Sequence, residues 1–416
     1  MHLRLLAAAL LLTLPVRAEE SPRRLFPDPP APAGAAAPPN QPIEVQALPA
    51  PGEQPGGLAG AEAALGGPLW QRGAPAGFEE LVARLPDAPV EPTLAQLQRN
   101  LLAAPGPAEL PDKGHLVPRA ERLLAMGAAE TALELLAQDP GPAPPKRAAL
   151  ELRARLAAGR TAEACATVAA LSTDASPWPE AAVVCAALAG DATAVELGLD
   201  RVAALDLPVD PALGGLARAA AADARFVLRR PLPGDPILQP LLRRVPIDVD
   251  PALITELDAA ARRALAVNPS IASAARAAAR GPVPLPPSTR PELSGAAPAD
   301  WTAAVETVPR EHRQRWAALV DGLGLEIPEP VWAALGREKS EGAAPAPDLV
   351  LWRGFETAWL AEQRGTVLLL TLLLLDGRPA DAAPLTLRRA LDALVALGLE
   401  QEASAVAAAT GGALGL

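Results

Sequence analysis

Two cysteines, Cys165 and Cys185, are the residues of this chain with the clearest capacity for chemistry, and no others occur in its 416 residues. Such a pair can be a redox centre, a set of metal ligands, two free thiols or a structural disulfide. Redox-active pairs usually have Cys-x-x-Cys spacing, and zinc sites need further Cys or His ligands nearby. With His115 and His312 as the only histidines beyond the first few residues, a disulfide or two buried thiols are favoured.

Two helices must position these cysteines. The turn-forming segment STDASPWPE lies between them, so we expect one helix to end near Leu171 and the next to begin near Pro179. Each cysteine is then six residues from its own end of the turn, and an antiparallel pair places such residues at the same height, as a disulfide requires. We predict a Cys165–Cys185 disulfide that closes about 20 residues and contributes roughly 3 kcal/mol in the chain-entropy model.

The first residues, MHLRLLAAALLLTLPVRA, have the pattern of a secretory signal peptide. An apolar run from Leu5 to Leu14 follows a short polar start, and Val16-Arg17-Ala18 forms a cleavage site. The run is shorter than the roughly 20 residues that span a bilayer, so we predict cleavage of residues 1–18 and no integral membrane span thereafter. Export agrees with a disulfide, and the strong excess of Arg over Lys, with the Ala, Gly and Pro bias, suggests a bacterial periplasmic or secreted protein.

Composition predicts an all-α fold. Half of the residues are hydrophobic, mostly Ala and Leu, and the chain has no Tyr and four Phe, so helix formers dominate and strand formers are scarce. The 49 prolines concentrate in breaks between helical regions. The predicted organisation is a signal peptide at 1–18, a disordered Pro-rich tether at 19–75, a helical-repeat domain at 76–280, a Pro-rich linker at 281–298 and a C-terminal helical domain at 299–416.

Three segments of the central region repeat one pattern. They read RLLAMGAAETALELLA, ARLAAGRTAEACATVAAL and AALAGDATAVELGLDRVAAL. Each has an apolar helical stretch, a turn glycine (Gly127, Gly159 or Gly190) and a second helix with a small residue five positions later. The glycines are 32 and 31 residues apart, close to the length of a helical hairpin repeat.

This pattern resembles the tetratricopeptide repeat, in which a Gly turn is followed five residues later by Ala. The resemblance covers about residues 117–205 and recurs around Gly398 and Ala403. Gly377 and Ala382 match in letters, but two full hairpins do not fit between Gly377 and Gly398, so at most one of these matches is genuine. The resemblance implies an α-solenoid that binds protein partners.

The C-terminal region is rich in tryptophan. Trp352, Phe355 and Trp359 share helical spacing, which fits either a core stripe or an aromatic surface that binds a partner or a carbohydrate. Residues 366–375, TVLLLTLLLL, are apolar on every side of a helix. We expect this short segment to be a central buried helix of the last domain.

No enzyme motif was found: the sequence lacks H-E-x-x-H, G-x-S-x-G, C-x-x-C and a phosphate-binding loop. A net charge of −11 disfavours binding to nucleic acid. The expected function is therefore a non-enzymatic periplasmic scaffold or assembly factor with a protein partner and no cofactor or metal. The alternative is a protein that binds or modifies cell-wall glycan through its Trp-rich C-terminal region.

Overall fold

Helices dominate the protein. The computed structural model describes residues 57–107, 115–139, 141, 143–171, 174–207, 210–230, 235–250, 253, 265, 268, 304–335 and 348–414. Over these residues the strands are β1 (Phe226–Leu228) and β2 (Ile247–Val249), a short parallel pair with Phe226 opposite Ile247. The prediction of a helical fold is confirmed, whereas the predicted signal peptide and the linker at 281–298 lie outside the described residues.

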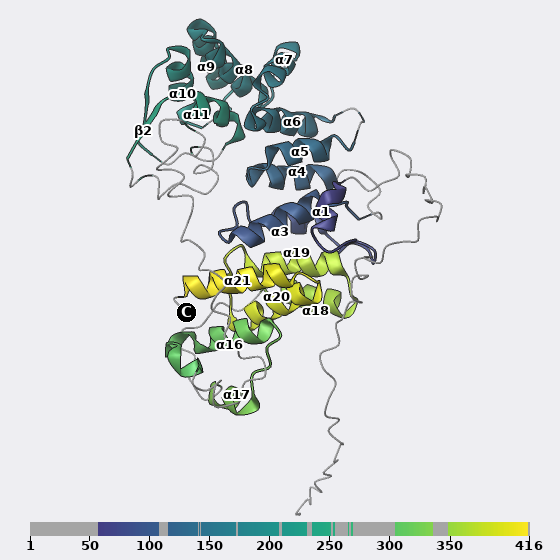
Figure 1. The fold of residues 1–416 in the computed structure, drawn as a ribbon. Helices are drawn as coiled ribbons and strands as arrows, with labels where there is room; N and C mark the ends of the chain where they lie inside the picture. The colour runs from purple at the N-terminus through teal and green to yellow at the C-terminus, as the bar shows by residue number, and fades with distance from the viewer. Residues whose placement is uncertain are drawn as a thin grey trace, which may run out of the picture.

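Most helices form antiparallel hairpins that pack side by side (Figure 1). The helices before the repeats are α1 (Ala59–Ala63), α2 (Phe78–Arg84) and α3 (Pro92–Ala103). The central hairpins are α4 (Leu116–Ala125) with α5 (Ala129–Leu136), α6 (Pro145–Ala158) with α7 (Thr161–Ala170), and α8 (Trp178–Ala189) with α9 (Ala192–Ala204). They are followed by α10 (Ala212–Ala221), the 3-10 helix η2 (Pro236–Leu238) and α11 (Gln239–Arg244).

The C-terminal part continues with further hairpins. Its elements are η4 (Arg310–His312), α16 (Arg313–Gly322), α17 (Glu329–Leu335), α18 (Leu349–Leu360), α19 (Arg364–Leu375), η5 (Pro379–Asp381), α20 (Pro384–Ala396) and α21 (Glu400–Ala413). Among the described residues, no helix is both long enough and apolar enough to span a membrane.

The predicted glycine turns are where the sequence places them. Gly127, Gly159, Gly190 and Gly398 all have φ between 76° and 83°, the left-handed conformation that ends a helix and favours glycine. The residues five positions later are fully buried at the helix crossings: Ala132, Ala164, Val195 and Ala403. Gly377 instead leads into η5, and Ala382 is only half-buried. Of the two competing C-terminal matches, Gly398 therefore opens the hairpin.

One hydrophobic core joins the two regions that the sequence predicted as separate domains. Side chains from α3, α4 and α5 share this core with α18, α19, α20 and α21. Helix α19 contacts both α2 and α3, and Figure 1 shows it next to α3. The two regions share a core because of α19, in which every residue from Gly365 to Leu375 except Leu374 is buried. A helix that is apolar all round must be covered all round, so the predicted boundary between 76–280 and 299–416 does not separate two cores.

A second core fills the other end of the central region. It is formed by α8, α9, α10 and α11, together with Leu152 and Leu156 of α6. The opposite face of α6 contributes Leu150 and Ala154 to the first core. Helix α6 therefore lies between the two cores, and the predicted repeat domain is divided between them.

The last part of the predicted tether, residues 57–75, is packed against the helices. Leu65 is fully buried and Trp70 is 8% exposed. The Leu58 amide donates to the carbonyl of Ala103 (2.7 Å), and the Gly365 amide donates to that of Leu69 (2.9 Å). The prediction of a disordered tether up to residue 75 is thus corrected, because large apolar side chains reappear from Leu58 onward and can offset the cost of ordering the chain.

Arginine side chains link neighbouring helices by binding the C-terminal ends of other helices. Arg147 donates to the carbonyl of Leu136 at the end of α5 (3.1 Å), and Arg364 to that of Leu397 at the end of α20 (3.0 Å). Four further arginines make the same contact at the ends of α2, α3, α6 and α8: Arg122, Arg119, Arg243 and Arg244. The last carbonyls of a helix have no partner within the helix and carry partial negative charge, so a guanidinium both satisfies and neutralises them.

The cysteines form a disulfide between α7 and α8. Their Cα atoms are 5.6 Å apart, and the bridge spans 20 positions. The helices end and begin at Ala170 and Trp178, within a residue or two of the predicted positions. The predicted pairing of Cys165 with Cys185 is therefore confirmed.

We predict that replacing both cysteines by serine lowers the free energy of unfolding by about 3 kcal/mol, because the bridge restricts the unfolded chain. Denaturant unfolding of the oxidised protein and of the variant measures this difference. Intact-mass analysis without reductant serves as the control, and two alkylatable thiols in the untreated protein would contradict the prediction.

We predict that Gly365→Ala destabilises the protein by about 1–3 kcal/mol, the usual cost of overpacking a core. A Cβ at position 365 would lie 2.6 Å from Cε3 of the buried Trp70 ring. Gly60→Ala is the matched control, because a Cβ there meets no atom within 4 Å. Thermal unfolding should show a lower Tm for Gly365→Ala alone, and equal Tm values would refute the close packing of Trp70 on α19.

Candidate functional site

The aromatic residues singled out in the sequence lie on α18, mostly on its buried side. Phe355 is fully buried and Trp359 is 6% exposed, while Trp352 is half-buried. The Phe355 and Trp359 rings stack with centroids 6.0 Å apart, and the Arg389 guanidinium lies 4.7 Å from the Trp359 ring centroid. Phe355 and Trp359 are thus core residues, which agrees with the core-stripe alternative for these two side chains.

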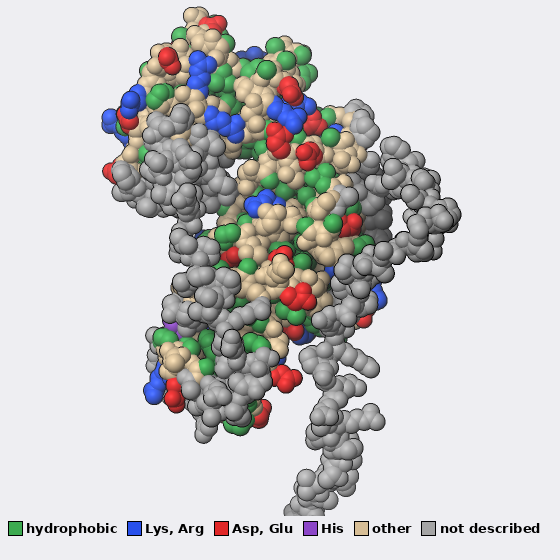
Figure 2. Space-filling view, viewed as in Figure 1, with side chains coloured by type: hydrophobic (Ala, Val, Ile, Leu, Met, Phe, Trp, Pro, Cys, Tyr) green, Lys and Arg blue, Asp and Glu red, His purple; other side chains and the backbone are tan. Residues whose placement is uncertain are grey.

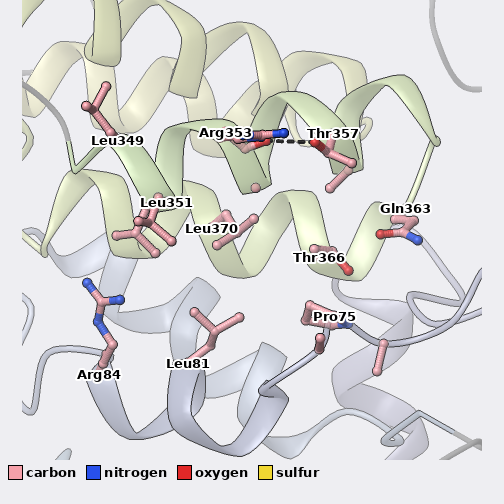
Figure 3. Close-up of a pocket in the computed structure, with 15 residues that line it drawn as sticks. Pro75, Leu81, Arg84, Leu349, Leu351, Arg353, Thr357, Gln363, Thr366 and Leu370 are labelled. Carbon is pink, nitrogen blue, oxygen red and sulfur yellow. Dashed lines mark hydrogen bonds between the residues drawn. The ribbon is translucent and has the colours of Figure 1, made fainter.

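A different face of α18 borders an open groove (Figure 3). The groove has a volume of about 780 Å³, within the range of about 300–1,000 Å³ that is usual for ligand sites. One wall comes from α18 and α19, and the other from α2 and the segment before it. Its lining is mainly apolar and includes Pro75, Leu81, Leu349, Val350, Leu351 and Leu370.

Two ion pairs hold the walls of the groove together. Arg84 of α2 contacts Asp348, which precedes α18, with 2.9 Å between Nη2 and Oδ2. At the other end of α18, Arg72 contacts Glu362 with 2.6 Å between Nη2 and Oε2. Both pairs join the segment at 57–84 to the α18–α19 hairpin, so the groove exists only where these distant parts of the chain meet.

Asp348 has two structural roles at the mouth of the groove. Its Oδ1 accepts hydrogen bonds from the amides of Val350 (2.9 Å) and Leu351 (3.2 Å), which caps α18. The hydrogen bond from Arg84 and these two amide bonds hold the pKa of the Asp348 carboxyl below its usual value. The carboxylate is therefore charged at neutral pH and fixes the first turn of α18 against α2.

The first turn of α18 presents apolar side chains to solvent. Leu349 is 80% exposed and Val350 is 77% exposed, and both line the groove. Scattered exposed leucines are ordinary, but two beside an apolar groove form a continuous surface of the kind that marks an interaction site.

The charged side chains that line the groove, among the described residues, are Arg84 and Arg353, in a chain with a net charge of −11. Asp348 and Glu362 lie at the two ends of the groove and are paired with Arg84 and Arg72. Elsewhere the charges are mixed. On the face shown in Figure 2, basic and acidic side chains are interspersed over the end that contains α8 to α11.

The wall of the groove contains a buried hydroxyl without a hydrogen bond. Thr366 is 3% exposed, and its Oγ1 has no partner among the described residues. Helical threonines usually donate to the carbonyl four residues earlier, as Thr371 does to Val367 (2.8 Å). For Thr366, the residue four positions earlier is Glu362. Glu362 has a φ of 53° and precedes the helix, which begins at Arg364.

The sequence does not reveal this groove, because its walls are far apart in the chain. Arg84 and Asp348 are 264 positions apart, and no local pattern marks them as neighbours. Among the described residues, no group of three or more His, Cys, Asp or Glu is placed to hold a metal ion. No family model, curated protein or solved structure matches this chain.

We predict that Asp348→Asn lowers stability at neutral pH but not in acid. The pKa of Asp348 is lowered in the folded protein, so its contribution is present above the unfolded pKa of about 3.9 and is lost as the pH falls through the folded value. Thermal unfolding of both proteins between pH 7 and pH 2 should show Tm values that converge at the acid end. A difference in Tm that is the same at every pH would contradict this assignment.

Proposed function

We propose that the chain is an exported, non-enzymatic helical-repeat scaffold that binds a protein partner through the groove between α2 and α18. The exposed pair Leu349 and Val350 beside the apolar lining is the observation that carries the proposal. Apolar surface of this kind gains free energy when a partner covers it.

The helical hairpins support the scaffold function. Three consecutive hairpins turn at left-handed glycines and bury a small residue five positions later, which is the pattern expected of a tetratricopeptide-like α-solenoid. Arrays of this type bind partners on extended surfaces without catalytic residues. The pairs α18–α19 and α20–α21 extend the same hairpin packing on the other side of α3.

The disulfide supports a periplasmic or secreted location. Structural disulfides persist in oxidising compartments and are rare in the cytosol, and the N-terminal sequence predicts export. The alternative of a glycan-binding or glycan-modifying protein has less support, because Trp359 is buried, although Trp352 is half-buried. The described residues that line the groove include neither tryptophan nor a carboxylate.

Site-specific photocrosslinking in cells tests the proposal. With p-benzoylphenylalanine in place of Val350, illumination should join the protein to one predominant partner that mass spectrometry identifies in the periplasmic fraction. The same substitution at Leu197 is the control, because Leu197 is 66% exposed on α9, outside the groove. A partner captured equally at both positions, or captured only at Leu197, would overturn the groove as the binding site.

A further inference from the structure

We infer that the groove recognises an apolar peptide segment of the partner that carries a carboxylate, and that this carboxylate binds Arg353. This inference rests on the proposed function and specifies the chemistry of the partner. The apolar walls select aliphatic side chains, while the guanidinium of Arg353, which is unpaired among the described residues, selects an acidic group.

The carboxylate preference follows from the arginines of the groove. Arg84 is neutralised by Asp348, but Arg353 is exposed and has no ion pair within the described part of the chain. Arg353 lies within α18, and its backbone carbonyl accepts a hydrogen bond from the Thr357 hydroxyl (2.9 Å). A guanidinium beside apolar surface can bind a carboxylate through two parallel hydrogen bonds.

The overall charge of the protein makes this local preference specific. A net charge of −11 repels acidic molecules that lack a complementary apolar segment. Among the described lining residues, Arg353 is the charged side chain without an acidic partner, so a partner carboxylate placed beside it is attracted. An apolar segment with a basic residue would instead place a cation near Arg353, which is a repulsive contact that provides specificity.

Fluorescence anisotropy with defined peptide pools tests the inference on the full mature protein. The probe is a pool of acetylated, fluorescein-labelled octapeptides of Leu, Val and Ala with one central Glu, and matched pools carry Gln or Lys at that position. The Glu pool should bind about three- to tenfold more tightly than the Gln pool, the effect of one ordinary net hydrogen bond, and the Lys pool should bind most weakly. In Arg353→Gln the Glu and Gln pools should bind equally.

Other outcomes separate this inference from the proposed function. If a partner crosslinks at Val350 but the Glu, Gln and Lys pools bind equally, the groove is a protein-binding site without a carboxylate preference, and the inference fails alone. If the crosslink at Val350 is intramolecular, to the N-terminal Pro-rich segment at 19–56, the occupant is the chain itself and both proposals fail. Glu selectivity that survives Arg353→Gln would refute Arg353 as the anion contact.

Discussion

The arrangement of the helices depends on the hydrogen bond between an arginine guanidinium and the free carbonyls at the end of a neighbouring helix. Each helix ends with carbonyls that have no partner of their own, and close packing keeps water away from several of these ends. Arg119 is almost fully buried, and its burial lowers the pKa to about 9, so it stays charged at neutral pH while its Nε donates to the carbonyl of Leu102 (2.7 Å). The planar, five-donor fork of arginine suits these positions, because it can reach two carbonyls at once, as Arg119 does with those of Leu102 and Ala104.

These contacts also determine where the groove forms. Arg364 at the start of α19 binds the end of α20 and lies beside Gly66, so it helps to fix the α18–α19 hairpin against the segment that contains Trp70. The ion pairs Arg84–Asp348 and Arg72–Glu362 then set the separation of the two walls. The groove is therefore a product of long-range closure, and its shape depends on residues that do not line it.

The features that could be predicted from the sequence are those encoded by neighbouring residues. Turn glycines such as Gly159, the buried helix at 366–375 and the Cys165–Cys185 bridge all follow from local spacing. The shared core and the groove could not be predicted, because α19 finds its neighbours α2 and α3 more than 260 positions earlier. The aromatic spacing at Trp352, Phe355 and Trp359 correctly indicated a helix, but periodicity alone does not say whether the stripe faces the core or solvent.

The closure of α19 onto α3 has a consequence for how the protein is made. Chains are synthesised from the N-terminus at about 5–20 residues per second, so α3 exists for many seconds before α19 is complete. During that interval the apolar face of α3, including the buried Leu94 and Leu101, lacks its final cover. The packing of α19 on α3 joins residues that are far apart in the chain, and such contacts raise the contact order and slow folding. The nascent protein thus has a period of exposed hydrophobic surface in which a chaperone would protect it from aggregation.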